Sequence, residues 1–423
     1  MTQKFNIRQQ FKQELASWSL IAFTMAAFEG GVAGVLVNHI FQDQVSTFWL
    51  SQAIALVAGA PALANLSSPL WARLEHGQNK VMLVSILLIG SSSSLLLFVF
   101  ASVNQMGLLM VVGASLVGRA CWAGVVTTRS SLWRANYPRY IRAKITASFA
   151  LPMSIILAST GVFIGWLSES SLLNVKILYV GLFFIGIYGA YLYSSLQLRG
   201  ANKLSEDENR IKQTEGQFNF RMLVRILVKD KKYRDYMGVM FLFGTGNLMF
   251  MAPLILILNN QFHSVQWQQI LITTSIPLAA MPLTINLWAK LLNRVHIIPY
   301  RAIHSWSFVT SIGLFALASA TGQSILLWPA SLVFGTAIAG AVLGWNLGHH
   351  DFTTPERASH YMAVHVTLTG IRGLIMPILG VNLYYFLGKL DPSLARYTLI
   401  LPFLISLMGA ISFVIFARKS EHG

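Results

Sequence analysis

The chain has 423 residues, of which 55% are hydrophobic and only 11% are charged. Soluble domains carry roughly a quarter charged residues, so this composition excludes an ordinary soluble protein. A net charge of +16 is typical of nucleic-acid binding when it gathers on a soluble basic domain, but the sequence holds no such domain. The single cysteine, Cys121, excludes an internal disulfide and most cysteine-based metal sites.

Apolar runs of about 20 residues, the length that crosses a bilayer as a helix, recur along the chain. Twelve such runs lie near 16–40, 46–66, 81–102, 106–128, 144–167, 174–196, 236–258, 267–288, 296–320, 324–346, 361–387 and 396–417. They lack the period-2 alternation of barrel strands, so helices are the only viable form. The sequence therefore predicts an all-α membrane protein with twelve transmembrane helices.

Apart from Arg119 and Arg372, the basic residues fall almost entirely on one side of the membrane. The opposite side receives only Lys176, Lys389 and Arg396. By the positive-inside rule, both tails and the long central loop are expected in the cytoplasm. The expected location is a bacterial inner membrane.

The longest polar stretch lies in the middle of the chain and predicts a division into two six-helix halves. We expect a first half over 1–196, a cytoplasmic linker over 197–235 and a second half over 236–423. Within the linker, apolar residues recur at helical spacing opposite Arg and Lys. This pattern indicates an amphipathic helix on the inner leaflet.

The segment Leu-Trp-Ala-basic-Leu occurs twice, at 70–74 and at 287–291, about half a chain apart. Both copies fall at the cytoplasmic end of the second predicted helix of their half, which indicates a duplicated unit of about 200 residues. With its two pseudo-symmetric halves, its long central loop and its basic loops after the second and eighth helices, the chain resembles the major facilitator superfamily of secondary transporters. The resemblance covers nearly the whole chain and implies a substrate cavity between the halves near the bilayer midplane.

The local motifs of this family are matched in part. The resemblance implies gating roles for five loop residues, which are Arg73, Gly77, Lys80, Lys290 and Arg294. Ala72 stands where the family has an acid in the first of these loops, and Glu75 is the acid that would replace it. In the fourth helix, Arg119 followed by Ala123 resembles the family's pattern of a buried arginine and a small residue. The Gly-x-x-x-Gly-Pro pattern of proton-driven drug exporters is absent from the fifth helix, which argues against multidrug export.

Three charged residues fall inside the predicted helices: Glu29 in the first, Arg119 in the fourth and Arg372 in the eleventh. A charge in the bilayer costs about 2.5 to 3.5 kcal/mol on insertion scales, so it usually faces a cavity or a partner. Glu29 is therefore the candidate proton-coupling residue, and the two arginines are candidate substrate ligands. The alternative for each is a permanent structural ion pair.

Five uncharged or weakly basic side chains complete the candidate substrate site: Trp122, Thr245, Asn247, His365 and Thr369. Trp122 shares a helix face with Arg119, and its alternative role is packing. His365, Thr369 and Arg372 follow one another by four and three residues, so they line one face of the eleventh helix. Thr245 and Asn247 offer hydrogen bonds from the seventh helix.

The segment "GWNLGHHDF" holds three candidate metal ligands, His349, His350 and Asp351. Adjacent histidines converge poorly on one ion from a helix end, and no HExxH or CxxC spacing supports them. Helix capping or gating is the alternative. No nucleotide-binding P-loop and no hydrolase signature occurs, so an ATP-driven pump and an enzyme are both disfavoured.

The sequence thus predicts a secondary transporter that works by alternating access and is coupled to protons. Two buried arginines against one carboxylate favour a small organic anion or a zwitterion as substrate. A transporter of a metal or a metal chelate is the alternative substrate class, and a non-transporting sensor or scaffold is the alternative function. We expect a small-molecule substrate and the lipid bilayer as partners, no nucleic acid, no cofactor, and a monomer.

Overall fold

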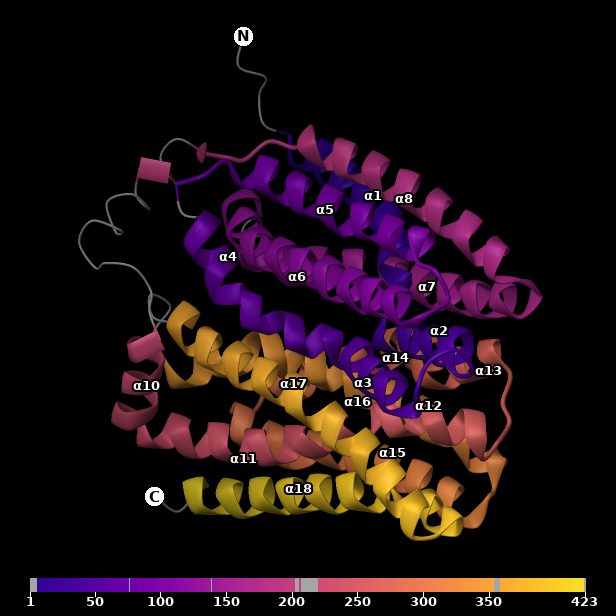
Figure 1. The fold of residues 1–423 in the computed structure, drawn as a ribbon. Coiled ribbons are helices and arrows are strands. Elements are labelled where there is room, and N and C mark those ends of the chain that lie inside the picture. Colours follow the sequence, from indigo (N-terminus) through magenta and orange to yellow (C-terminus); the bar gives the residue numbers. More distant parts are fainter. Residues whose placement is uncertain are drawn as a thin grey trace.

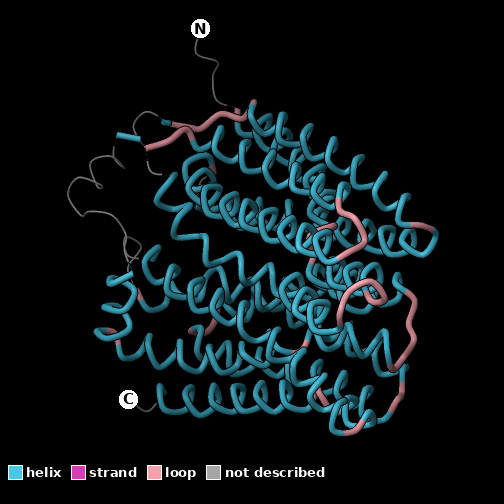
Figure 2. Tube along the Cα trace, in the orientation of Figure 1, coloured by secondary structure: helices cyan, strands magenta, loops and turns pink. Residues whose placement is uncertain are grey.

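The computed structural model describes residues 6–75, 77–137, 139–201, 205–206, 220–353 and 358–421. Within these ranges the regular elements are helices, and no strand occurs (Figure 2). The first half comprises α1 (Ile7–Ala26), α2 (Gly30–Phe41), α3 (Thr47–Leu63), η1 (Ala64–Ser67), α4 (Ser68–Glu75), α5 (Lys80–Phe100), α6 (Gln105–Asn136), α7 (Arg139–Ser170) and α8 (Leu172–Ser194). The rest comprises α10 (Phe220–Lys229), α11 (Lys231–Met249), α12 (Met251–Asn260), α13 (Gln266–Ile270), η2 (Leu271–Ser275), α14 (Ile276–Leu292), α15 (Ile297–Thr321), η3 (Ser324–Leu326), α16 (Leu327–Leu347), η4 (Gly348–Phe352), α17 (Ala358–Leu390), η5 (Pro392–Tyr397) and α18 (Ile400–Glu421).

Twelve stretches in the described part of the chain are long and apolar enough to cross a membrane, which confirms the predicted number. Figure 1 shows them as two helical halves lying side by side, the first in indigo to magenta and the second in salmon pink through orange to yellow. The start of α1, the end of α18 and α10 lie at the same end of the bundle. We call this the termini end and the other the far end.

The first span begins at Ile7 rather than near residue 16, because α1 continues through the polar segment that precedes the apolar run.

The repeated tryptophans occupy matching positions in the two halves. Trp71 lies in α4 and donates its indole N–H to the Ser67 hydroxyl at 3.0 Å. Trp288 lies in the last turns of α14 and donates to the Thr336 carbonyl at 2.8 Å. Each ring thus lies at the same end of the second membrane span of its half. The duplication inferred from the sequence is therefore seen in the fold.

Several membrane spans are interrupted near their middle. The first breaks between α1 and α2 at Ala27–Glu29, where Glu29 is extended (φ −61°, ψ 133°) before two glycines. The seventh breaks between α11 and α12 at Phe250, and the eighth contains a π-helical turn, η2. Non-helical backbone inside a membrane is tolerated only where protein or a hydrated cavity satisfies it. The breaks therefore mark the places in the bundle where polar chemistry is possible.

α10 is amphipathic, as the linker sequence predicts. Leu223 is buried against the bundle, whereas Arg221 and Arg225 are exposed. The linker residues 202–204 and 207–219 lie outside the described ranges. The expected boundaries of the two halves at 196 and 236 remain a prediction.

The two halves are joined by hydrogen bonds at the far end. His39 of α2 bonds Gln266 of α13 at 2.8 Å, and Gln42, just after α2, bonds Asn259 of α12 at 3.3 Å. Gly31 also packs against the second half, where a β-carbon would come within 2.2 Å of the Thr274 hydroxyl oxygen. These contacts close the far end directly between the halves. By contrast, no hydrogen bond between described residues joins α1 or α6 to the second half.

Candidate functional site

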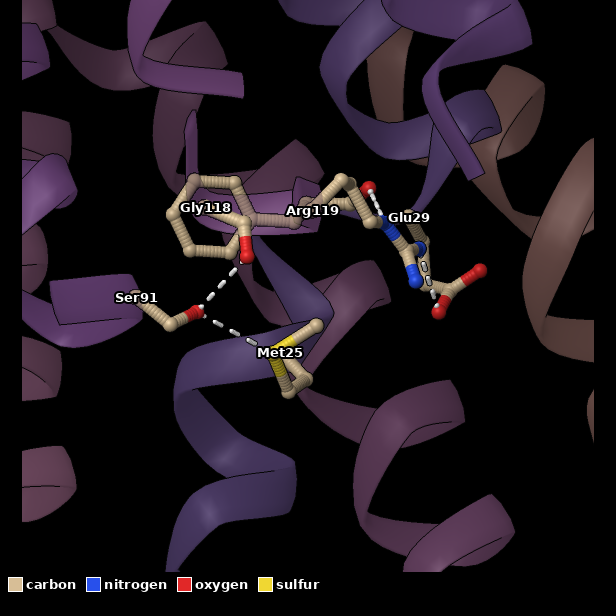
Figure 3. A network of polar contacts seen from close by, with 6 residues as sticks. Met25, Glu29, Ser91, Gly118 and Arg119 are labelled. Carbon is tan, nitrogen blue, oxygen red and sulfur yellow. Dashed lines mark hydrogen bonds and ion pairs between the residues drawn. The ribbon is translucent and has the colours of Figure 1, made fainter. Parts of the chain in front are cut away.

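The break in the first span places Glu29 beside Arg119. Arg119 Nη2 lies 2.8 Å from Glu29 Oε1, and the two side chains are 7% and 24% exposed. Figure 3 shows the two side chains meeting at the helix break. Two of the three charges predicted inside the membrane thus pair with each other. Of this pair, the carboxylate is the more accessible partner.

The backbone around the break holds Arg119 in place. Its Nε donates to the Phe28 carbonyl at 2.8 Å, a group that the interruption of the helix leaves open to a side chain. Ser91 of α5 donates to the Gly118 carbonyl at 3.1 Å and contacts the Met25 sulfur at 3.6 Å (Figure 3). These contacts tie α1, α5 and α6 together around the ion pair. Arg119 is therefore fixed by backbone geometry as well as by charge.

Arg372 lies apart from this pair, between α17 and α11. Its Nη2 donates to the Thr369 hydroxyl at 2.8 Å, and its Nη1 donates to the carbonyls of Met240 and Phe241. Gly244 makes room for it, because a β-carbon there would lie 1.8 Å from Arg372 Nη1. The structure thus brings Thr369 and Arg372 together as predicted but does not bring Arg372 to Glu29. In this conformation the two arginines belong to separate clusters, one in each half.

Three other predicted substrate ligands, Trp122, Thr245 and Asn247, contact other residues of the protein. Trp122 packs edge-on against Trp18, with ring centroids 5.4 Å apart. Thr245 donates to the Phe241 carbonyl of its own helix at 2.9 Å. Asn247 accepts from Ser406 of α18 at 3.0 Å, so it is bonded within the second half.

His365 is 2% exposed and lies edge-on to Trp345, with ring centroids 4.3 Å apart. Its Nε2 has no hydrogen-bond partner in the described part of the chain. His365 shares a helix face with Arg372, but the structure shows no bond between them. It is therefore enclosed within the second half.

The predicted gating residues lie at the termini end. Arg73, Lys290 and Arg294 are exposed, whereas Lys80 is 1% exposed and donates to the Glu75 carbonyl at 3.2 Å. Gly77 has a φ of 73°, a conformation that favours glycine.

Glu75, the acid expected to replace the missing one at Ala72, is 6% exposed. Its Oε1 accepts from Ser131 of α6 at 3.1 Å. It therefore links the loop to the fourth span, as an acid in that loop would be expected to do.

One of the three candidate metal ligands, Asp351, caps a helix. Asp351 Oδ2 accepts the amide of Ile297 at 2.7 Å, which caps the start of α15. His349 is buried, and the side chain of His350 lies outside what the structure describes. No group of three possible metal ligands gathers among the described residues.

The expectation of three charges inside the membrane was wrong, because the first and fourth spans extend farther than their apolar runs and because Arg301 lies inside the ninth run, 296–320. Glu14 is fully buried in α1, where it accepts hydrogen bonds from Trp18, Trp133 and Tyr137. Arg129 in α6 lies over the rings of Trp18 and Trp133. The signal in the sequence was the helical spacing that continues beyond each apolar run.

The third missed charge is Arg301 of α15, which is 2% exposed. Its Nη1 lies 3.3 Å from His304 Nδ1, and His304 Nε2 lies 2.8 Å from the Ala337 carbonyl. With Nε2–H donating to that carbonyl, Nδ1 of a neutral imidazole is left to accept from the guanidinium. This pair is enclosed within the second half and has no contact with the Glu29 cluster.

Comparison with known proteins places this geometry in a family. The family model of the Major Facilitator Superfamily matches residues 18–377. A search of curated proteins found no match.

Among solved structures, the chain is similar to the nucleoside transporter NupG, with a TM-score of 0.70, 14% identity, and 97% of this chain and 100% of that chain covered. It is similar to a D-xylose-proton symporter, with a TM-score of 0.69, 12% identity and 97% of each chain covered. It is also similar to a POT family transporter in complex with a thioalcohol-conjugated peptide, with a TM-score of 0.69, 11% identity, and 97% and 96% covered. At these identities the likeness concerns the fold alone.

Proposed function

The chain belongs to the major facilitator superfamily, and from that premise we propose that it is a proton-coupled secondary transporter for a small organic anion or a zwitterion with a free carboxylate. The observation that carries the proposal is the Glu29–Arg119 ion pair at the break in the first span. The pair supplies both a group that can take up a proton and a cation that can bind an anion. Neither function requires covalent chemistry or a cofactor.

The coupling follows from competition for Arg119. While Glu29 is ionised, its carboxylate occupies Arg119 Nη2 at 2.8 Å. A proton on Glu29 removes the charge that holds the pair together and leaves the guanidinium N–H groups free for a substrate carboxylate. Substrate binding and proton uptake are then linked, because each favours the state in which Glu29 is neutral.

Alternating access uses the closed far end. In the proposed orientation both termini are cytoplasmic, as the distribution of basic residues indicates, so the far end faces away from the cytoplasm. The hydrogen bonds of His39 and Gln42 to the second half then form a closed outer gate. Rocking of the two halves about the Glu29 region would break these contacts and open the far end. The proposed unit is a monomer in a bacterial inner membrane.

The metal-chelate alternative gains no support from the described residues, because Asp351 caps a helix there. The sensor or scaffold alternative is separated from transport by a direct assay. Purified protein is first screened against organic anions and metal complexes by its unfolding temperature. Anions that stabilise it are then followed into proteoliposomes under an imposed pH gradient. Accumulation of an organic anion that requires Arg119 supports the proposal, and accumulation of a metal complex independent of Arg119 contradicts it.

A further inference from the structure

Along α6, arginines and tryptophans alternate on one face. Arg119, Trp122, Val126, Arg129 and Trp133 are spaced by three and four residues, so they form a single row along the helix. The row begins at the Glu29–Arg119 pair and runs toward the termini end (Figure 1). At 1.5 Å per residue, Arg129 lies roughly 15 Å along the helix from Arg119. The second arginine therefore stands between the central pair and the end where α1 begins.

Arg129 is held by two aromatic faces. Its guanidinium carbon lies 4.5 Å from the ring centroid of Trp18 and 4.2 Å from that of Trp133. Aromatic faces attract a guanidinium but accept none of its in-plane N–H donors. In the described part of the chain, Arg129 has no hydrogen bond and no ion pair, and its side chain is only half-buried.

Glu14 explains why this cation is stable without a direct partner. The indole N–H groups of Trp18 and Trp133 both donate to Glu14 Oε1, and the Tyr137 hydroxyl donates to Oε2. Both carboxyl oxygens of Glu14 thus accept hydrogen bonds from neutral donors. Because the indole N–H groups donate to Glu14, both rings are polarised in the direction that strengthens the attraction of their faces for Arg129. The in-plane donors of Arg129 stay unused.

The row is also partly exposed at this position, since Arg129 is not fully buried. Val126, in the same row, is 39% exposed. The α1 and α6 helices, which hold Arg129 between them, form no hydrogen bond with the second half among the described residues. A rigidly held guanidinium with free donors on such a surface matches the planar geometry of a carboxylate.

We propose that Arg129 is a second anion-binding position, whose guanidinium, held by the rings of Trp18 and Trp133, takes the carboxylate of a small organic anion on its free in-plane N–H donors. Its role as an intermediate binding site for substrate on the way to Arg119 rests on the proposed function. Its ability to bind an anion does not. The two sites are therefore tested separately.

The experiment uses quenching of tryptophan fluorescence in the purified full-length protein in detergent. Iodide, an anion, quenches an indole on contact, and acrylamide is the uncharged counterpart. We expect iodide to show a saturable component that benzoate displaces and benzamide does not. In Arg129→Gln this component should weaken about tenfold or more, as loss of a charge-assisted contact implies. Acrylamide quenching should stay the same.

Matched variants separate the outcomes. Arg225→Gln removes an exposed cation from α10 and should leave the iodide component intact. Arg119→Gln should also retain it, even if the proposed function fails. Arg129→Lys keeps the charge without the planar fork, so iodide quenching should persist while displacement by benzoate weakens several-fold. If Arg129→Gln retains the benzoate-sensitive component, or Arg129→Lys binds benzoate as well as the parent, Arg129 is a structural residue and the proposal is wrong.

Discussion

Arg119 of α6 makes two contacts with residues at the break in the first span. One is an ion pair to Glu29 at 2.8 Å, and the other is a hydrogen bond to the Phe28 carbonyl at 2.8 Å. Only the first of these contacts depends on charge at Glu29. Protonation of Glu29 would therefore release one edge of the guanidinium while the other edge keeps it in place. This arrangement allows a substrate to replace the carboxylate without displacement of the arginine.

The first prediction concerns coupling. Glu29→Gln preserves the size of the side chain but cannot bind or release a proton. We expect it to abolish accumulation driven by a pH gradient in proteoliposomes while counterflow exchange of the substrate continues. Asp235→Asn, which removes an exposed carboxylate that pairs with Arg234 on the surface, is the matched control and should accumulate substrate normally. Full accumulation by the Gln protein would make Glu29 a structural residue, with His365 the next group to test.

The second prediction concerns packing around Arg372. In Gly244→Ala the new β-carbon would lie 1.8 Å from Arg372 Nη1, so the guanidinium must leave its carbonyl partners. We expect destabilisation of about 1–3 kcal/mol, as overpacking produces, seen as a lower unfolding temperature. Gly238→Ala in the same helix meets no atom within 4 Å and should be neutral or stabilising. Equal effects at the two positions would mean that Arg372 adapts without cost.

The third prediction concerns the far end. In a Cys121→Ser background, Gln42→Cys with Asn259→Cys joins the two halves where their side chains meet at 3.3 Å. A short bis-methanethiosulfonate reagent should cross-link the two cysteines and stop transport, and reduction should restore it, because the gate can then open. The two single-cysteine variants serve as controls and should be insensitive to the reagent. Transport by the cross-linked protein would show that this end need not open.

The fourth prediction concerns orientation. In the same background, Gln323→Cys lies in an exposed loop at the far end, and Arg418→Cys lies near the end of α18. A membrane-impermeant maleimide should label the first in intact cells and the second only after the membrane is opened. Labelling in the reverse order would invert the proposed topology.

The fifth prediction concerns Tyr137. Burial, and then the charge of Glu14, raise the pKa of Tyr137 above its ordinary value of 10.0, so the folded protein holds this proton more tightly than the unfolded chain. Its contribution to stability is therefore constant below about pH 10 and is lost as the pH rises above that value. Tyr137→Phe should lower stability by about 1.5–3 kcal/mol at pH 7, because one oxygen of Glu14 loses its donor.

The matched control for this prediction is Tyr188→Phe, which changes an exposed tyrosine. It should leave the unfolding temperature unchanged. If the two variants unfold at the same temperature, the hydroxyl of Tyr137 contributes nothing measurable to the fold.

Hydropathy and charge in the sequence were enough to predict the twelve spans and the two halves, because the bilayer admits few alternatives to a helix of about 20 apolar residues. They were also enough to single out Glu29 and Arg119, because a charge in a long apolar run is costly and therefore conspicuous. Glu14 and Arg129 escaped notice because they lie just outside the predicted runs, where an error of a few residues in a boundary moves a charge from membrane to water. Arg301 lies inside the ninth run, close to the basic loop that precedes it, and was overlooked there.

What only the tertiary structure decided is which side chains meet. Glu29 pairs with Arg119, 90 positions away, and Arg372 with carbonyls of α11, although the sequence marked both arginines alike. Helical spacing shows which residues share a face but says nothing about which neighbouring helix that face contacts. That choice depends on how the helices pack, as at Gly244, where a missing side chain admits the guanidinium of Arg372. The row of Arg119, Arg129 and Trp133 could be read from spacing alone, but Trp18, the other ring that holds Arg129, lies on α1, which only the folded chain brings beside α6.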